Sequence, residues 1–188
     1  MGEPPPHVQT SRWELSATGY FYSRSDSFFA IATADRDALH LETRYNYEAL
    51  DSGSLFVGWT FSGGDALTWK LRPILGAVFG STQGVAPGLE ANMAYGIVDF
   101  YTETEYMHDF NAHEDSFTYA WSELGLIPLP WLRFGLVGER SKVYKSDRDI
   151  QRGGFAQVTV GRVTLGTYVF NPDDSANRFV ILTLGAIF

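Results

Sequence analysis

Apolar and polar residues alternate along most of this chain from Arg12 onward. Across residues 13–23, for example, the odd positions begin with Trp13 and Leu15, whereas the even positions begin with Glu14 and Ser16. Successive side chains of a β-strand point to opposite faces, so a period of two predicts strands with one apolar face and one polar face. The helical period is not sustained over three turns in any stretch.

Clusters of Gly, Pro, Asp and Asn divide the alternating pattern into segments of roughly ten residues. The predicted strands are residues 12–23, 27–34, 38–49, 54–62, 66–80, 88–98, 100–109, 117–127, 131–143, 152–160, 162–170 and 178–188. This interpretation has twelve strands, with ten as the alternative. Tight connections, as at 62–65 and 161–162, alternate with longer polar ones such as 111–116. The pattern therefore predicts an all-β fold, an antiparallel up-and-down transmembrane β-barrel.

The composition is rich in aromatic residues and glycine, yet it contains no long apolar run. Of the 188 residues, 45% are hydrophobic, 15% are aromatic and none is cysteine. A transmembrane helix needs about 20 consecutive apolar residues, and apolar stretches such as 124–132 are far shorter. Alternation distributes the apolar residues over one face of each strand, so no window looks hydrophobic. The length predicts a single domain, and the lack of cysteine excludes disulfide bridges and cysteine-based metal centres.

The last predicted strand carries a resemblance to a known class of proteins. It ends in Phe188, with Val180, Leu182, Leu184 and Ala186 on the same face. This segment resembles the terminal strand of bacterial outer-membrane β-barrels, and residues 12–188 together resemble the small members of that class. The resemblance implies a Gram-negative outer membrane, with contact to the lipid bilayer and lipopolysaccharide. It also implies that the barrel-insertion machinery reads the C-terminal strand, and it indicates no particular activity.

Residues 1–11 are predicted to be a flexible tail, because they are polar and contain three consecutive prolines. Their sequence does not match a signal peptide. Since the remainder of the chain points to an exported protein, we expect that a signal peptide was removed before Met1.

The aromatic residues of the apolar faces are predicted to gather near the two rims of the barrel. If the first strand rises from the periplasmic side, one rim contains Trp13, Trp69, Trp131 and Phe188. The other rim contains Phe21, Tyr45, Tyr47, Phe79, Tyr106, Phe117 and Tyr119. Aromatic rings favour membrane interfaces, which supports a membrane barrel. The alternative, a soluble barrel with the apolar face inside, would bring too many large rings into its core.

Two segments do not follow the simple alternation. Residues 28–34 have no clear polar face. In residues 117–126, alternation that points Phe117, Tyr119 and Trp121 toward lipid also points Glu123 toward lipid. A charged side chain on the lipid face costs a few kcal/mol near the membrane midplane. Either a β-bulge near Ser122 returns Glu123 to the inside, or Glu123 lies near a rim.

The polar faces predict a charged lumen. Twelve tilted strands leave a lumen roughly 10 to 12 Å wide, which is normally filled with water. Its predicted acidic lining is Glu14, Glu42, Glu48, Glu90, Glu103, Glu105 and Glu139, and its predicted basic lining is Arg44, Lys70, Arg72 and Arg133. Lumen-facing glycines are predicted at Gly58, Gly76, Gly96, Gly135 and Gly166.

The positions of the turns suggest how these charges are arranged. They predict Gly58 between Arg44 and Lys70, and Gly96 between Arg72 and Glu103. The resulting hypothesis is a constriction in which Arg44, Lys70 and Arg72 face Glu103 and Glu105 and produce a transverse field. The alternative is that these charges are ordinary ion pairs that hold the shape of the barrel.

The predicted function is a narrow, charged, water-filled pore for ions or small polar solutes, with a mild preference for cations because acids exceed bases. A non-conducting structural or adhesion barrel is the alternative, although the short loops argue against large protein ligands. An outer-membrane lipid esterase would need His108 and Ser116, which match no family motif, so we expect no enzyme activity. We expect no cofactor and no metal, since Asp173 and Asp174 lack calcium-ligand spacing. A net charge of −8 argues against nucleic-acid binding.

Overall fold

The computed structural model describes residues 12–23, 28–143 and 149–188, and the tail predicted for residues 1–11 lies outside this part of the chain. The strands are β1 (Glu14–Tyr22), β2 (Phe28–Arg36), β3 (Leu39–Tyr45), β4 (Ser52–Trp59), β5 (Phe61–Gly63), β6 (Leu67–Gly80), β7 (Gly84–Tyr95), β8 (Val98–Asp109), β9 (Phe117–Leu129), β10 (Leu132–Val143), β11 (Asp149–Val160), β12 (Val163–Phe170) and β13 (Phe179–Ile187). A single 3₁₀ turn, η1 (His113–Asp115), precedes β9. None of the described segments forms a helix of the length and apolarity that would cross a membrane.

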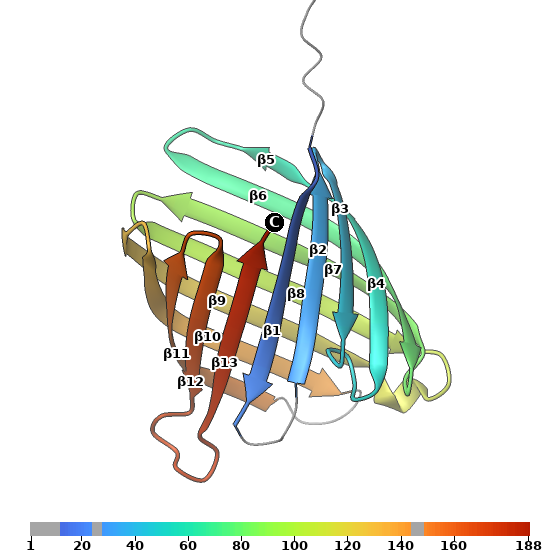
Figure 1. Ribbon diagram of the computed structural model, residues 1–188. Coiled ribbons are helices and arrows are strands. Elements are labelled where there is room, and N and C mark those ends of the chain that lie inside the picture. The colour runs from blue at the N-terminus through green and yellow to red at the C-terminus, as the bar shows by residue number, and fades with distance from the viewer. Residues whose placement is uncertain (1–11, 24–27, 144–148) are drawn as a thin grey trace, which may run out of the picture.

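The strands form a closed antiparallel barrel (Figure 1). Apart from β4 and β5, which do not pair with each other, each strand pairs with its neighbours in the chain, and β1 pairs with β13 to close the ring. Both β4 and β5 pair with β6, because the strand that they share is interrupted at Thr60. The wall therefore has twelve strands, which confirms the predicted all-β, up-and-down barrel.

The two ends of the barrel differ in the length of their connections (Figure 1). The turns that join β2 to β3, β5 to β6, β7 to β8, β9 to β10 and β11 to β12 are tight, and Phe188 lies at the same end. We call this the turn end. The longer connections β3 to β4, β8 to β9 and β12 to β13 lie at the opposite end, the loop end.

One predicted turn was misplaced. The sequence pattern indicated a turn at Val98 and Asp99, whereas β7 ends at Tyr95 and β8 begins at Val98. Gly96 makes this turn with a positive φ of 60°, a conformation that glycine adopts readily. Its prediction as a lumen-facing glycine was therefore wrong.

Large apolar side chains cover the outside of the barrel. Leu55, Leu75, Leu136 and Leu182 are all more than half exposed. Burying such a surface in lipid is favourable, and alternation along each strand leaves the polar residues for the inside. The rim aromatics Trp13, Trp131 and Phe188 are exposed at the turn end, with half-buried Trp69 near them, and Tyr45 and Tyr106 are exposed toward the loop end.

The face assignment predicted for β9 was wrong. Tyr119 and Trp121 line the interior together with Glu123, and Phe117 packs against buried side chains. Glu123 pairs in unbroken register with Tyr101 and Val137, so neither the bulge near Ser122 nor the rim position is needed. The prediction assumed that large aromatic residues face lipid.

Tyr47 also lies inside rather than at the outer rim. It follows Asn46, whose φ of 58° is in the left-handed region and ends the extended path of β3. The alternation of inward and outward side chains therefore stops at Asn46, and the Tyr47 side chain points into the lumen.

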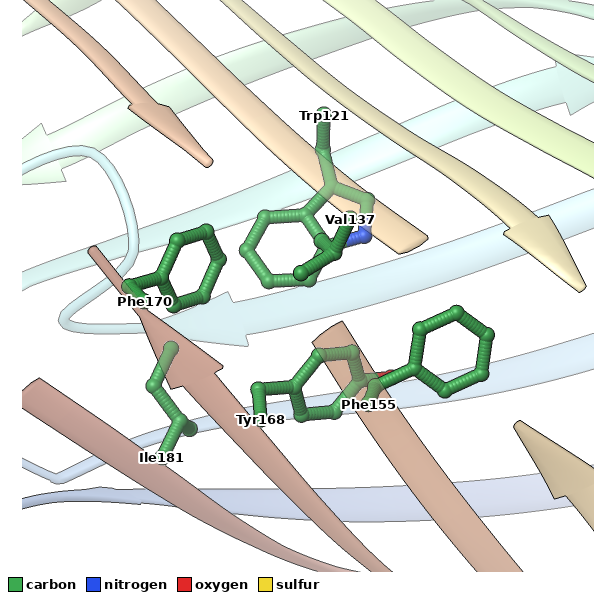
Figure 2. Close-up of a cluster of buried hydrophobic side chains, with 6 residues drawn as sticks. All are labelled: Trp121, Val137, Phe155, Tyr168, Phe170 and Ile181. Atoms are coloured by element: carbon green, nitrogen blue, oxygen red, sulfur yellow. The ribbon is translucent and has the colours of Figure 1, made fainter. Parts of the chain in front are cut away.

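Two apolar clusters fill part of the interior. The larger contains Trp121, Val137, Phe155, Tyr168, Phe170 and Ile181 from β9 to β13, and Figure 2 shows these side chains gathered between the strands. The smaller contains Phe56, Ile74, Val78, Ala86 and Met107 from β4 and β6 to β8. The clusters occupy part of the lumen. The remaining space lies along β1 and β2, opposite β6–β9 in the middle of the barrel and beside β11–β13 near the turn end.

Candidate functional site

Three cavities follow one another inside the barrel along β1. The central chamber, about 340 Å³, has walls from β1–β3 on one side and β6–β9 on the other. The turn-end vestibule, about 330 Å³, shares Ser16, Thr18 and Tyr20 with this chamber. The loop-end vestibule, about 300 Å³, shares Tyr47 and Tyr119 with it. Since neighbouring cavities share wall residues, the three spaces lie in sequence between the two ends of the barrel.

Arg44 lies at the centre of the first charged group. Its guanidinium is 2.9 Å from Glu103 Oε1 and donates a 2.9 Å hydrogen bond to Glu105 Oε2. It also donates to Glu42 and lies 3.9 Å from Glu48. The structure thus brings together three members of the predicted constriction, from β3 and from β8 across the lumen.

Aromatic rings enclose the same guanidinium. Its carbon lies 4.3 Å from the centre of the Tyr47 ring and 4.1 Å from that of Phe56. The Arg44 side chain has no exposed surface. This arginine is therefore held by rings and carboxylates together, without access to the cavities.

Arg72 lies at the centre of the second charged group. It donates hydrogen bonds of 2.8 Å to Glu90, 3.0 Å to Asp35 and 3.0 Å to Thr60. Its side chain is 20% exposed, and it lines the central chamber with both carboxylates. Arg72 therefore links β6 to β7 and β2, and its guanidinium faces the central chamber.

His40 joins the two groups. Its ring nitrogens lie 2.9 Å from Asp35 and 3.2 Å from Glu42, so one side chain connects a carboxylate of each arginine. We call the combined set the charged belt: Asp35, His40, Glu42, Arg44, Arg72, Glu90, Glu103 and Glu105.

Lys70 does not join the belt. It is exposed, pairs in register with Ser62 and Asn92, and makes no ion pair within the part of the chain that the structure describes. It lines a separate cavity near the turn end with Gly63 and Asp99.

The predicted registers were wrong. Gly58 lies opposite His40 and Ile74, not between Arg44 and Lys70, because the turns before and after β4 are centred at other residues than assumed. Arg44 pairs with Ser54, and Lys70 pairs with Ser62. Arg72 lies opposite Glu90 because β6 ends at Gly80 and β7 begins at Gly84, and Glu90 lies opposite Glu103 because the turn between β7 and β8 is at Gly96.

Arg133 forms a further ion-pair group toward the turn end. It lies 2.6 Å from Asp99, donates to Glu123 and to Gln157, and stacks 4.6 Å from the centre of the Phe155 ring. Glu123 accepts further hydrogen bonds from the Trp121 indole at 2.9 Å and the Tyr168 hydroxyl at 2.8 Å. The apolar cluster thus supplies the donors for a buried charge.

Two of the remaining predicted lining residues lie in the vestibules. Glu14 borders the turn-end vestibule and Glu139 borders the loop-end vestibule. Glu48 also borders the loop-end vestibule, between β3 and β4. Its Oε1 accepts a 2.9 Å hydrogen bond from Ser54, whereas its buried Oε2 receives none from the described residues. Burial raises the pKa of the Glu48 carboxyl above its ordinary value.

The described lumen contains more acid than base. Its carboxylates are Glu14, Asp35, Glu42, Glu48, Glu90, Asp99, Glu103, Glu105, Glu123 and Glu139, and its guanidinium groups are Arg44, Arg72, Arg133 and Arg162. Sequence reasoning missed Asp35, which it assigned to a tight turn although β2 continues to Arg36. It also missed Asp99, which it assigned to the misplaced turn.

The side chains of His40, Glu42 and Glu90 are close enough to surround a metal ion, with ligand atoms within 4.8 Å of one another. However, Arg44 bonds Glu42, Arg72 bonds Glu90, and Asp35 bonds the His40 ring. Contacts within the charged belt therefore explain why these three side chains lie close together.

The two residues considered for an esterase do not contact each other. Ser116 is buried, and its hydroxyl accepts a 3.0 Å hydrogen bond from the backbone N–H of Asp109. His108 packs against the rings of Tyr106, Phe110 and His113.

The loop carboxylates Asp173 and Asp174 serve local structure. Asp173 forms a 2.6 Å ion pair with exposed Arg152, which lowers the pKa of the Asp173 carboxyl. Asp174 accepts hydrogen bonds from the backbone of Ala176 and Asn177.

Comparison with solved structures shows which fold this arrangement belongs to. The KdgM porin in complex with disordered oligogalacturonate superposes with a TM-score of 0.65 at 9% sequence identity, covering 93% of this chain and 98% of that one. The fold is that of an outer-membrane porin. The NanC porin gives a TM-score of 0.60 at 11% identity, covering 92% and 98% of the two chains.

A third porin-type barrel, the Acinetobacter baumannii outer membrane protein Omp33, gives 0.53 at 15% identity, covering 95% and 97%. The sequence matches no protein-family model and no curated protein. The similarity to these proteins is therefore one of fold. Any preference for a particular solute depends on the side chains in this lumen.

Proposed function

We propose that this chain forms a narrow, cation-preferring pore across the bacterial outer membrane. The observation that carries the proposal is the charged belt in the wall of the central chamber, with a vestibule on either side of it. The exposed apolar wall meets the bilayer and lipopolysaccharide, and the C-terminal strand β13 engages the barrel-insertion machinery.

Cations are favoured because the described lumen contains ten carboxylates and four guanidinium groups. Interactions between charges are stronger in a narrow lumen with low-dielectric walls than in open water. Oligogalacturonate, which is bound in the KdgM structure, is an acidic oligosaccharide, and this lumen would repel such a solute.

The belt also sets the direction of the field inside the pore. Arg72 projects from β6, whereas Glu42 and Asp35 lie on β3 and β2 across the chamber. A transverse field of this kind orients polar solutes as they pass. Arg44, which is covered by interior rings and carboxylates, holds Glu103 and Glu105 in place.

Single-channel recording in planar bilayers tests the proposal. We expect discrete currents that prefer K⁺ over Cl⁻, and Glu90→Gln should reduce this preference because it removes a chamber carboxylate. Glu114→Gln is the matched control, since Glu114 is exposed in η1 outside the lumen. A barrel that inserts but carries no current would instead support the structural or adhesion alternative.

A further inference from the structure

The loop-end vestibule has an unusual lining. Five aromatic side chains border it: Tyr22, Phe29, Tyr47, Phe117 and Tyr119. Four of them form a continuous wall, because ring centres lie 5.6 Å apart in Tyr22–Phe29, 5.3 Å in Phe29–Tyr47 and 5.6 Å in Tyr47–Tyr119. An aromatic face carries partial negative charge, so several faces around one space attract a cation.

Carboxylates accompany the rings. Glu48 and Glu139 both border the vestibule, but the Glu48 side chain has no exposed surface, so the carboxylate that a solute can meet is that of the partly buried Glu139 on β10. A carboxylate beside the cavity favours a cation in it and accepts hydrogen bonds from N–H groups. This observation is independent of the rings.

The lumen already holds the protein's own cations in this way. The Arg44 guanidinium lies between the rings of Tyr47 and Phe56 and contacts carboxylates, and Arg133 stacks on Phe155 while it pairs with Asp99. Rings and carboxylates thus act together on two guanidinium groups inside the same barrel. The loop-end vestibule offers the same two kinds of group to a solute.

We propose that the loop-end vestibule is a binding site for organic cations that carry a primary ammonium or guanidinium group on an apolar stem. Building on the proposed pore function, the site selects the solute before it reaches the charged belt. The rings hold the stem and the cationic head, and the Glu139 carboxylate accepts the N–H groups. Inorganic cations gain less, since they have no apolar surface to place against the rings.

Three five-carbon probes separate charge from shape. We would titrate detergent-folded protein by calorimetry with 1,5-diaminopentane, 1,5-pentanediol and glutarate. The diamine carries two positive charges, the diol carries none, and glutarate carries two negative charges. The diamine should bind at least about tenfold more tightly than the other two probes. Equal binding of diamine and diol would overturn the proposal.

Adjacent residues of β1 supply a matched pair of variants. Tyr22→Leu removes a ring from the vestibule, whereas Phe21→Leu removes one from the outer face. Tyr22→Leu should weaken diamine binding by about tenfold and Phe21→Leu should leave it unchanged. Glu139→Gln, which preserves the shape of the side chain, should also weaken diamine binding, and this variant decides between the outcomes if Tyr22→Leu does not fold. Equal weakening by Phe21→Leu would contradict the site.

Channel recording distinguishes failure of this site from failure of the pore. Diamine added on the loop side should interrupt the K⁺ current of the parent protein. If current flows but the diamine binds no better than the diol, the site is wrong and the pore stands. If the diamine binds as expected but the inserted barrel carries no current, the pore is wrong and the site stands.

Discussion

Arg44 and Arg72 belong to one charged belt and were predicted to have the same role, but their surroundings differ. Arg44 has no exposed side-chain surface, lies between two rings and is within 4 Å of four carboxylates. Arg72 is 20% exposed, contacts two carboxylates and lines the chamber. The difference indicates that Arg44 holds the wall together, whereas Arg72 meets the passing solute. The hypothesis of ion pairs that hold the shape of the barrel therefore describes Arg44, and the hypothesis of a transverse field that acts on solutes describes Arg72.

Removing Arg44 should have the largest effect on stability. Arg44→Met leaves Glu42, Glu48, Glu103 and Glu105 buried without their cation, and breaking such a buried pair typically costs about 3–5 kcal/mol. Urea titration of the barrel folded in lipid vesicles, read by electrophoretic mobility, measures the free energy of unfolding. A loss no greater than that of Arg72→Met would remove the distinction between the two arginines.

Crowding the ring beside Arg44 should have the next largest effect. A Cβ at Gly76 would lie 2.4 Å from the Phe56 ring, so Gly76→Ala must displace this ring from the Arg44 guanidinium. Overpacking of this kind costs about 1–3 kcal/mol. Gly138→Ala is the control, because the nearest atom there is 4.0 Å away. Equal unfolding free energies for the two variants would show that the Phe56 contact is dispensable.

Removing Arg72 should change selectivity more than stability. Arg72→Met frees Glu90 and Asp35 in a water-accessible chamber, so we expect a loss of only about 1 kcal/mol. The ratio of K⁺ to Cl⁻ permeability should rise, because a fixed positive charge has left the route. An unchanged ratio would mean that ions do not pass Arg72.

Removing Lys70 should have the smallest effect. Its side chain is exposed outside the belt, so Lys70→Met should change the unfolding free energy by less than about 0.5 kcal/mol. Selectivity should stay close to that of the parent protein. A shift in the permeability ratio as large as that of Arg72→Met would return Lys70 to the constriction.

Alternation predicted the barrel and the inward direction of the belt residues, because side-chain parity along a strand is a local property. Arg44 was therefore expected near Glu103 and Glu105 even though the registers used were wrong. Registers depend on the residue at which each turn is centred, and neither the turns before and after β4 nor the turn at Gly96 has an unambiguous signal.

The content of the lumen was harder to predict than its wall. Hydrophobicity does not distinguish an aromatic ring that faces lipid from one that packs inside, so Tyr119 and Trp121 were assigned to the wrong face. Glu123 beside them was the available signal, since a buried carboxylate and the Trp121 and Tyr168 donors belong together. The cage of rings in the loop-end vestibule depends on such inward aromatics from β1, β2 and β9.

The zero-current potential of the inserted parent protein in a KCl gradient tests the central claim most directly. An acid-rich route past the charged belt predicts a potential whose sign corresponds to K⁺ permeating more easily than Cl⁻, and Arg72→Met should move it further in that direction. A potential of the opposite sign, or an inserted barrel without current, would contradict the account.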